Sequence, residues 1–592
     1  MLVLVLVTTG GLGRAAAAPA AAVVNDPPAL LPFTVARGVL FGAATRYWIL
    51  SPGVDDQYSS TLTANYNGVT PENAMKWAAT EPAKDQYDFS SADPIVAFAA
   101  ANHQQVRGHN LVWGNDNPAW LEQGTWTRDQ LIQIMHDHIS NVVTHFENEF
   151  PGTVTQWDVV NEAVTGPGQL VPNIWERVIG SDYISMAFQF AHQADPNSQL
   201  YYNDYGGEGL GPKSDAINWV AAYLKSTGVP IDGVGLESHF DLNPPPQADI
   251  ASNMTRLASE GLKVAVTEMD VRLLPPAGYT SPTDAQSWDQ AHIYYATLAT
   301  CLAQPACSTF VTWGFTDKYS WIPTSYPGYG WALPFSDTYA HKSAYTGLAA
   351  ALQGGADPYC TTYASPATGT HRVCGALLAK YQALGGPSGF LGYPTTDETP
   401  TSDGVGRFNH FANDGSIYWS PNTGAWSIHG AIRAKWASMG WEQGVLGYPT
   451  TDETGTSDGV GRFNHFSTAG SIYWTPNTGA WSIHGRIRDK YQALGGPSSV
   501  LGYPVTDENG TPDGVGRFNH FSNSGSIYWT PNTGAWSIHG RIRDKWASMG
   551  WERSCLRYPV SDEFAIPGGR QSNLQQGVIT YSFSSGQATP SC

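Results

Sequence analysis

Short apolar runs alternate with longer amphipathic segments between residues 38 and 348. Segments such as 131–146 and 216–225 repeat apolar residues at helical spacing. Strands followed in turn by helices over about 310 residues predict a (β/α)8 barrel. A doubly wound open sheet is the alternative, but no glycine-rich phosphate turn follows the first run. The predicted strands are residues 39–43, 68–70, 105–108, 157–160, 200–203, 234–236, 264–267 and 310–313.

The pattern changes after residue 381, where the chain begins to repeat itself. Leu-Gly-Tyr-Pro starts at residues 391, 446 and 501, and a degenerate copy starts at 556, so the spacing is 55 residues. Each full unit also carries short aromatic runs, such as 406–411, 416–419 and 424–430, and then a helical segment such as 431–439. The repeats therefore predict a β-rich C-terminal repeat domain of about four small units that pack on their neighbours.

These patterns divide the chain into four parts. We expect a signal peptide over residues 1–22, a barrel over 30–352, a linker over 353–370 and the repeat domain over 371–592. The first part joins an apolar run to alanine-rich residues, as secretory signals do, although no basic residue precedes the run. The run is far shorter than the about 20 residues that a membrane span requires. The expected location is therefore extracellular.

The six cysteines agree with export. Their number is even and none stands in Cys-x-x-Cys spacing, which favours disulfides in an oxidising compartment over a metal site. Six cysteines allow about 15 pairings. Proximity in the sequence favours Cys301–Cys307, Cys360–Cys374 and Cys555–Cys592.

Composition narrows the class of partner. The net charge of −19 argues against nucleic acid and against an anionic membrane surface. The 22 tryptophans and 29 tyrosines favour carbohydrate, because aromatic faces stack on sugar rings, although large cores also use aromatics.

A glutamate closely follows two of the predicted strands: Glu162 comes after residues 157–160, and Glu268 after residues 264–267. Barrel enzymes place catalytic groups at the carboxyl ends of their strands. Two carboxyl groups at one barrel mouth provide the acid and the nucleophile or base that hydrolysis of a sugar bond needs. Either glutamate alone could simply follow a core strand, so the hypothesis depends on the motifs around them.

Six motifs surround these glutamates, at residues 70–77, 107–113, 157–163, 202–205, 267–270 and 312–317. With them, residues 35–348 resemble the family-10 glycoside hydrolases, which are chiefly secreted endo-β-1,4-xylanases. The resemblance implies a retaining enzyme that cleaves xylan without a metal or organic cofactor. It implies that Glu162 is the acid/base and Glu268 the nucleophile, with carboxyl groups about 5–5.5 Å apart.

The resemblance also assigns supporting roles. Asn161 is implied to bond the sugar 2-hydroxyl, His239 to contact the nucleophile and Asp270 to hold His239. Without the motif, His239 would be interpreted as a core histidine, and Lys76 with Glu72 as a helix-surface ion pair. The implied substrate-binding residues are Glu72, Asn73, Lys76, His109, Trp113, Glu237, Trp313 and Trp321.

Three positions depart from the family pattern. Gly114 stands where the family usually has histidine, Asp116 where glutamine is common, and Glu237 where glutamine is usual. Added carboxyl groups near the cleft could raise the pKa of a catalytic glutamate or bind a different sugar. Xylan is therefore the favoured substrate, and another β-glycoside, such as a glycosylated plant compound, is the alternative. A third hypothesis is a non-catalytic protein that binds sugar or cell wall.

Residues 371–560 resemble the Leu-Gly-Phe-Pro repeats of exported actinobacterial proteins, with Tyr in place of Phe. The resemblance implies association with a cell-wall polymer. A carbohydrate-binding module is the competing interpretation, because Tyr418, Trp419 and Trp426 could form a stacking face, although a role in the core of each unit is slightly favoured. Metal ligation by His410 and His429 is conceivable, but contacts with backbone or solvent are the favoured interpretation.

Overall fold

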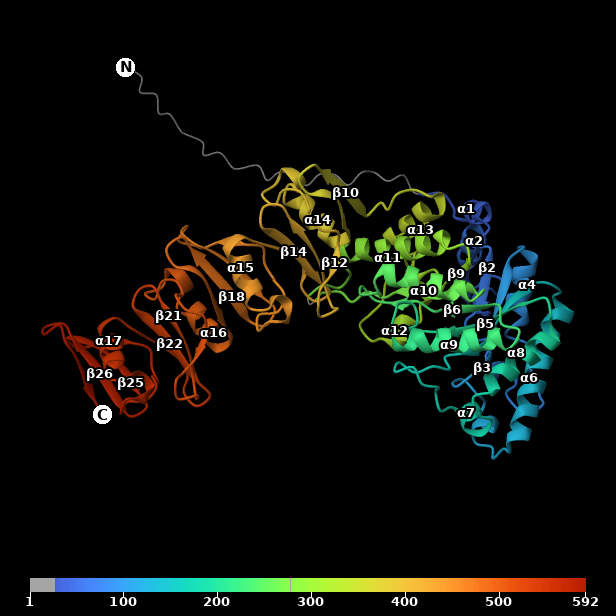
Figure 1. Ribbon diagram of the computed structural model, residues 1–592, viewed down its shortest axis with the longest axis horizontal. Helices are drawn as coiled ribbons and strands as arrows, with labels where there is room; N and C mark the ends of the chain where they lie inside the picture. The colour runs from blue at the N-terminus through green and yellow to red at the C-terminus, as the bar shows by residue number, and fades with distance from the viewer. Residues whose placement is uncertain (1–26, 277) are drawn as a thin grey trace, which may run out of the picture.

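The computed structural model describes residues 27–592 except residue 277. The predicted signal peptide lies outside the described residues. The remaining chain forms a barrel from which a row of small sheets extends to the C-terminus (Figure 1). No helix in the described part of the chain combines the length and the apolar character that crossing a membrane requires.

Eight parallel strands close into the predicted barrel. In the order of their pairing the sheet reads β6-β5-β4-β3-β2-β1-β9-β8, and β6 pairs with β8 to close it. A short strand, β7 (His239–Phe240), pairs with the end of β8. The eight strands are β1 (Leu40–Thr45), β2 (Gly68–Pro71), β3 (Gln105–Trp113), β4 (Val154–Asn161), β5 (Gln199–Asp204), β6 (Gly233–Leu236), β8 (Lys263–Val271) and β9 (Cys307–Thr312).

Helices surround the barrel, and the longer ones show clear sequence signals. The longest, α6 (Arg128–Glu149), contains the predicted segment 131–146 and begins with a capping box between Thr127 and Gln130. The next longest, α11 (Asp284–Ala303), begins in the same way at Thr283. The others are α1 (Leu31–Arg37), α2 (Asp56–Asn65), α3 (Trp77–Thr80), α4 (Asp93–Ala101), α5 (Ala119–Glu122), α7 (Ile174–Val178), α8 (Tyr183–Ala194), α9 (Pro212–Ser226), α10 (Gln247–Ser259), α12 (Ile322–Ser325) and α13 (Ser343–Gln353), with the 3-10 turn η1 (Asp317–Tyr319).

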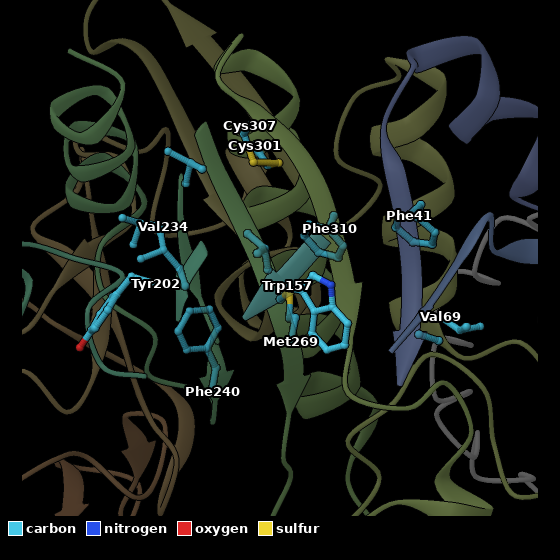
Figure 2. Close-up of a cluster of buried hydrophobic side chains, with 14 of the residues drawn as sticks. Phe41, Val69, Trp157, Tyr202, Val234, Phe240, Met269, Cys301, Cys307 and Phe310 are labelled. Carbon is cyan, nitrogen blue, oxygen red and sulfur yellow. A yellow bond between two sulfur atoms is a disulfide. The ribbon is translucent and has the colours of Figure 1, made fainter. Parts of the chain in front are cut away.

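Large apolar side chains of the strands lie in a buried cluster (Figure 2), and those of Trp157 and Phe41 pack outward, against Phe146 of α6 and against Tyr66, which follows α2. Trp157 of β4 is fully buried beside Gly108 of β3. A Cβ on Gly108 would lie 2.2 Å from the Trp157 ring, so only glycine leaves space for the indole. Phe41 of β1 stacks on Phe310 of β9 with ring centroids 5.6 Å apart. Because such cores are close-packed, the loops at the carboxyl ends of the strands start from rigid positions.

The first repeat unit is attached directly to the barrel. Part of the predicted linker forms the hairpin β10 (Cys360–Ser365) and β11 (Gly369–Cys374), and α14 (Gly375–Ala383) follows it. α14 packs on α11 of the barrel. Its residues Leu377 and Tyr381 belong to the same apolar cluster as the barrel core. The first repeat therefore packs directly on the barrel. The boundaries between the domains stay a prediction.

Four antiparallel sheets of four strands follow, which confirms the predicted β-rich repeats. Each core is shared, because the cluster around Tyr418 and Ile428 also contains Leu446 and Phe466 of the next unit. The strands are β12 (Thr399–Pro400), β13 (Arg407–Phe411), β14 (Gly415–Ser420) and β15 (Gly424–His429); β16 (Thr454–Gly455), β17 (Arg462–Phe466), β18 (Gly470–Thr475) and β19 (Gly479–His484); β20 (Asn509–Gly510), β21 (Arg517–Phe521), β22 (Gly525–Thr530) and β23 (Gly534–His539); and β24 (Phe564–Ile566), β25 (Gly569–Leu574), β26 (Gly577–Ser582) and β27 (Ala588–Ser591).

Short helices separate these sheets, and disulfides close three loops. The helices are α15 (Gly430–Ser438), α16 (Gly485–Ala493) and α17 (Gly540–Ser548), with the 3-10 turns η2 (Gly386–Ser388), η3 (Trp441–Gln443), η4 (Gly496–Ser498) and η5 (Trp551–Arg553). The disulfides are Cys301–Cys307, Cys360–Cys374 and Cys555–Cys592, which confirms the pairing predicted from proximity.

Candidate active site

A cleft of about 700 Å³ opens at the carboxyl ends of the barrel strands. With one exception, it brings together the residues that the sequence predicts for catalysis and substrate binding. Asp270 is the exception, because it lies behind His239. The predicted residues that line the cleft are Glu72, Asn73, Lys76, His109, Trp113, Asn161, Glu162, Glu237, His239, Glu268, Trp313 and Trp321.

Glu162 directly follows β4 and is held in an unusual backbone conformation. Its φ of 51° lies in the left-handed region, and its N–H donates to the Asn203 carbonyl at 2.9 Å. Strained non-glycine residues of this kind cluster at functional sites. Burial raises the pKa of Glu162 to about 7, and the negative charges of Glu268 and Asp204 add to the effect. Glu162 therefore retains a proton in a large fraction of molecules near neutral pH.

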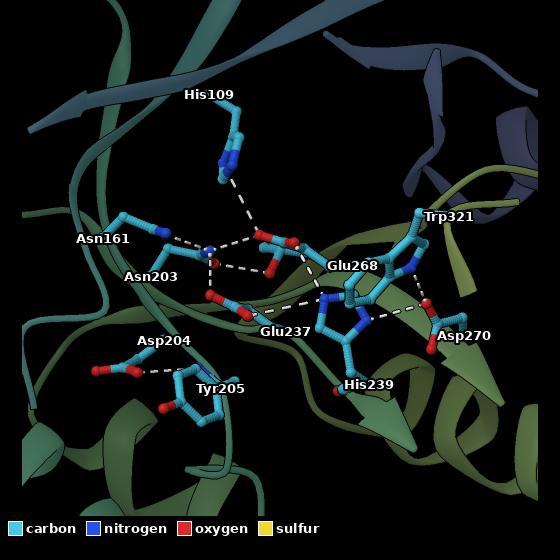
Figure 3. Close-up of polar contacts among 12 residues, drawn as sticks. His109, Asn161, Asn203, Asp204, Tyr205, Glu237, His239, Glu268, Asp270 and Trp321 are labelled. Atoms are coloured by element: carbon cyan, nitrogen blue, oxygen red, sulfur yellow. Dashed lines mark hydrogen bonds and ion pairs between the residues drawn. The ribbon is translucent and has the colours of Figure 1, made fainter. Parts of the chain in front are cut away.

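Glu268 lies on β8 in a different electrostatic environment. Its Oε1 accepts a hydrogen bond from Asn203 Nδ2 at 2.9 Å, and its Oε2 lies 3.3 Å from His239 Nε2. Burial opposes ionisation, but the nearby His109 and His239 outweigh it and lower the pKa of Glu268. Figure 3 shows Glu268 between His239 and Asn203. The pKa values of Glu162 and Glu268 are thus shifted in opposite directions within one cleft.

His239 connects Glu268 to a second carboxylate behind it. Its Nδ1 lies 3.0 Å from Asp270 Oδ2, and this oxygen also accepts from the Trp321 indole at 2.8 Å. Burial disfavours the charged ring, but Asp270 and Glu268 outweigh burial and raise the pKa of His239 to about 10. The imidazolium can therefore donate to both carboxylates and fix the orientation of Glu268.

Asn203 forms the centre of the hydrogen-bond network, although the sequence analysis assigned it no role. Its Nδ2 lies within 3.2 Å of Asn161 Oδ1, Glu268 Oε1 and Glu237 Oε1. Its Oδ1 accepts from Thr267 Oγ1 at 2.7 Å. The available signal was its place at the end of the fifth strand, within the motif at residues 202–205.

A buried polar group below the cleft also escaped the sequence analysis. Asp158 accepts hydrogen bonds from Arg107 Nε at 3.1 Å, and its Oδ2 lies 3.0 Å from His109 Nδ1. Burial would raise the pKa of Asp158, but Arg107 and His109 outweigh it and lower that pKa. The ionised Asp158 therefore fixes His109, whose Nδ1 also lies 3.8 Å from Glu268.

The residues after β2 hold one another at the cleft wall. Arg46 donates two hydrogen bonds to Glu72, at 2.8 and 2.7 Å. Lys76 donates to Asn73 at 2.8 Å and pairs with Asp116 at 3.1 Å. The alternative ion pair between Lys76 and Glu72 on a helix is not formed, because residues 72–76 are not helical and Glu72 pairs with Arg46.

The three departures from the family pattern have different structural consequences. Burial raises the pKa of Glu237 well above its usual value, and the charges of Glu268 and Glu162 add to this, which favours its neutral form. Asp116 is half exposed and paired with Lys76. A Cβ on Gly114 would lie 3.2 Å from Asn173, so a larger residue would displace that side chain.

Several residues in or beside the cleft were assigned no role from the sequence. Lys213 pairs with Asp204 at 2.8 Å and lies over the Tyr205 ring at 3.4 Å. Arg272 stacks on Tyr326 at 4.5 Å. Glu208, Phe240, Asp241, Asn243 and Pro245 complete this part of the cleft.

Two groups bring several metal-ligand atoms within 4.8 Å. In the first, Glu237, His239 and Glu268, both ring nitrogens of the histidine already contact carboxylates, Nδ1 that of Asp270 at 3.0 Å and Nε2 that of Glu268 at 3.3 Å. In the second, His292 stands beside Cys360 and Cys374, whose sulfurs are joined in a disulfide and form no thiolates. The second group therefore offers no thiolate ligands.

Known protein families match the barrel and the repeats of this chain separately. The glycosyl hydrolase family 10 model matches residues 31–351, and the LGFP repeat model matches residues 333–389, 391–444, 446–499 and 501–554. Endo-1,4-beta-xylanase D of Talaromyces funiculosus is 40% identical over 323 residues, which span 54% of this chain and 76% of that protein. Endo-1,4-beta-xylanase B of Thermotoga neapolitana is 39% identical over 305 residues, which span 52% and 85%.

Solved structures show the same similarity. Native xylanase 10B from Thermotoga maritima superposes with a TM-score of 0.52 at 37% identity, over 55% of this chain and 98% of that one. Xylanase 10B from Thermotoga petrophila RKU-1 in complex with xylobiose gives a TM-score of 0.53 at 37% identity, over 55% and 97%. With a barrel, a two-carboxyl cleft and a family match over more than half of its length, the chain belongs to glycosyl hydrolase family 10.

Proposed function

We propose that this protein is a secreted retaining endo-β-1,4-xylanase and that its repeats hold it at a cell wall. The observation that carries the catalytic part is the opposite protonation of Glu162 and Glu268 in one cleft. The two relatives described above are endo-1,4-beta-xylanases, and this chain matches most of the length of each. One similar solved structure is a xylanase in complex with xylobiose.

The first step forms a covalent sugar–enzyme bond. The ionised Glu268 attacks the anomeric carbon while Glu162 gives its proton to the departing glycosidic oxygen. The bond between that oxygen and the anomeric carbon breaks, and the shortened chain leaves. Asn161, held by Asn203 at 2.8 Å, bonds the sugar 2-hydroxyl and stabilises the positive charge that develops on the ring.

The second step releases the sugar with its original configuration. Glu162, now ionised, takes a proton from water, and the oxygen of that water attacks the anomeric carbon. The bond to Glu268 breaks and both carboxyl groups return to their starting states. His239 and Asn203 stabilise the departing carboxylate because both contact Glu268.

The shape of the cleft suits a polymer. Glu72 follows β2 and Glu237 follows β6, and these strands lie on opposite sides of the closed barrel. Lining residues therefore extend to both sides of the carboxyl pair, as cleavage within a chain requires. Trp313 and Trp321 provide aromatic surfaces for sugar rings.

The catalytic roles are tested by Glu268→Gln and Glu162→Ala. Each variant is expected to lose at least about 100-fold in kcat/KM on soluble xylan while retaining the circular dichroism of the native chain. Full activity in either folded variant would refute the assignment.

The substrate is tested by comparing products from xylan, cellulose and several aryl β-glycosides. The alternative β-glycoside is supported by Gly114, which follows the lining residue Trp113, and by Asp116, which pairs with the lining residue Lys76. Turnover of an aryl glycoside with none of xylan would select that alternative. A non-catalytic role is disfavoured because a binding groove needs no acid beside a nucleophile.

A further inference from the structure

The repeats place one set of residues in the same arrangement at each junction. We call this set the junction site: a glycine that opens the helix, a glutamate, an arginine and the aromatic residue paired with that arginine across two strands. The four copies are Gly375, Glu398, Arg407 and Trp419; Gly430, Glu453, Arg462 and Trp474; Gly485, Glu508, Arg517 and Trp529; and Gly540, Glu563, Arg570 and Tyr581. A histidine precedes the glycine in the last three copies.

In the first copy the barrel itself occupies the site. Asp289 of α11 accepts a hydrogen bond from the Ala376 N–H at 3.0 Å and pairs with Arg407 at 3.2 Å. A Cβ on Gly375 would lie 1.9 Å from Asp289 Oδ1, so the carboxyl group of Asp289 packs directly against the glycine. Burial raises the pKa of Asp289 to about 6, with Arg407 opposing, so the group is a carboxylate at neutral pH.

The other three copies are open at the same position. A Cβ on Gly430, Gly485 or Gly540 would meet no atom within 4 Å. The side chain of Arg407 is 14% exposed beneath the barrel, whereas those of Arg462, Arg517 and Arg570 are 45%, 44% and 38% exposed. The aromatic partner follows the same trend, because Trp419 is fully buried and Trp474, Trp529 and Tyr581 are only partly buried.

The open arginines are already oriented for a ligand. Glu453 contacts Arg462 at Nε, 2.6 Å away, and Glu508 contacts Arg517 at Nε, 2.5 Å away. Nη2 of Arg462 and of Arg570 also donates to the backbone carbonyl of the paired glutamate, at 3.5 and 3.3 Å, which leaves Nη1 for a second carboxylate. Arg407 shows that one such arginine can serve two carboxylates, because its Nη1 contacts Glu398 and its Nη2 contacts Asp289. The helix that follows each glycine adds backbone N–H groups with no partner inside the helix.

We propose that the second, third and fourth junction sites each bind a carboxylate of an acidic glycan, and that this is how the repeats recognise a wall polymer. The proposal rests on the proposed wall association and specifies its ligand. The ligand class follows from the first copy, where the occupant is a carboxylate. The buried glutamate of each site would repel a doubly charged phosphate more strongly than a singly charged carboxylate.

The surroundings of the site favour a uronic-acid polymer over an acidic peptide. An aromatic side chain stands opposite the arginine in each copy and can stack on a sugar ring whose carboxylate the arginine holds. The fourth site opens into a cavity of about 530 Å³, lined also by Val500, Ile542 and Tyr581. Three sites in one chain bind a repeating polymer more tightly than any single site.

The test uses the full chain and polygalacturonate as the probe. Combined Arg462→Gln, Arg517→Gln and Arg570→Gln substitutions are expected to weaken binding at least tenfold, measured by calorimetry at low salt. The control carries Lys84→Gln, Arg128→Gln and Arg256→Gln, which remove the same charge from ion pairs on the barrel. The control is expected to stay within twofold of the native chain.

Two further ligands complete the experiment. Fully methyl-esterified polygalacturonate is expected not to bind, because it lacks the carboxylates. Equal binding of the ester, or an equal loss in both variants, would overturn the proposal. Binding of polyglutamate but not polygalacturonate, lost only in the junction variant, would overturn the glycan assignment. Retention on isolated walls without binding of polygalacturonate would refute this ligand while leaving the proposed wall association in place.

Discussion

The two central glutamates share their chemistry and differ in their neighbours. Glu162 has two negative groups nearby, Glu268 and Asp204, and its pKa is about 7. Glu268 contacts His239 and has His109 nearby, and its pKa is lowered. Because burial raises the pKa of any carboxyl group, the histidines decide which one is the nucleophile.

This difference predicts the basic limb of the pH profile. As the pH rises through about 7, Glu162 loses the proton that the leaving oxygen needs, so kcat/KM on xylan is expected to fall. Initial rates between pH 5 and 9 would measure it. In Glu162→Ala the residual rate on an aryl β-xyloside with a good leaving group should lack this limb. A limb at the same pH in that variant would assign the titration to another group.

Glu237 makes a prediction about stability. Its pKa is raised in the folded state, so the folded chain binds a proton more tightly than the unfolded chain does. The contribution of Glu237 to the free energy of unfolding is greatest below the unfolded pKa of about 4.3. This contribution decreases as the pH rises from there toward the folded pKa. Glu237→Gln removes this loss and is expected to raise Tm at pH 7 but not at pH 4. Thermal melts at both pH values would check it, and an equal shift at both would contradict it.

Site residues could be predicted from the sequence where a motif assigns a role to one side chain. They could not be predicted where the role depends on contacts between several strands. Glu162 and Glu268 stand at strand ends within motifs, so both could be selected. Asn203 and Asp158 act through partners on neighbouring strands. No spacing along one strand reveals such partners, because the barrel brings together residues that are far apart in the chain.

At the scale of elements, α11 has two roles. It covers the barrel wall, and its Asp289 anchors the first repeat through Arg407 and Ala376. Asp289→Ala is expected to destabilise the chain by about 3 kcal/mol, because removing one partner leaves the other without its pair in a mostly buried site. Asp284→Ala on the same helix is the control and is expected to cost less than about 1 kcal/mol. Urea unfolding would measure both, and equal effects would contradict the anchoring role.

The strands of the barrel could be predicted because apolar runs identify buried parallel strands. The hairpin of β10 and β11 could not, because its strands are polar and partly exposed, and prolines nearby resemble a linker. The position of the hairpin is set by the contact of α14 with α11, which joins residues that are distant in the sequence. An example is the hydrogen bond from the Ala376 N–H to the Asp289 carboxylate, 87 residues away.

At the scale of the whole molecule, the cleft and the repeats occupy separate regions. The described residues that line the cleft run from Glu72 to Tyr326, so the repeats contribute none of them. The first repeat nevertheless shares its core with the barrel through Leu377 and Tyr381. We therefore expect the first repeat to affect activity only by stabilising the barrel. We expect the later repeats to have no effect on activity.

Two truncations would separate these roles. A chain that ends at residue 444 retains α14, the first sheet and the contact with α11, so its kcat/KM on soluble xylan is expected to stay within twofold of the full chain. Its retention on isolated cell walls should fall strongly, because the three open junction sites are lost or incomplete. A chain that ends at residue 355 uncovers the apolar face of α11 and should melt at a lower temperature. Equal wall retention by the full chain and the 444-residue chain would show that the later repeats do not hold the enzyme at the wall.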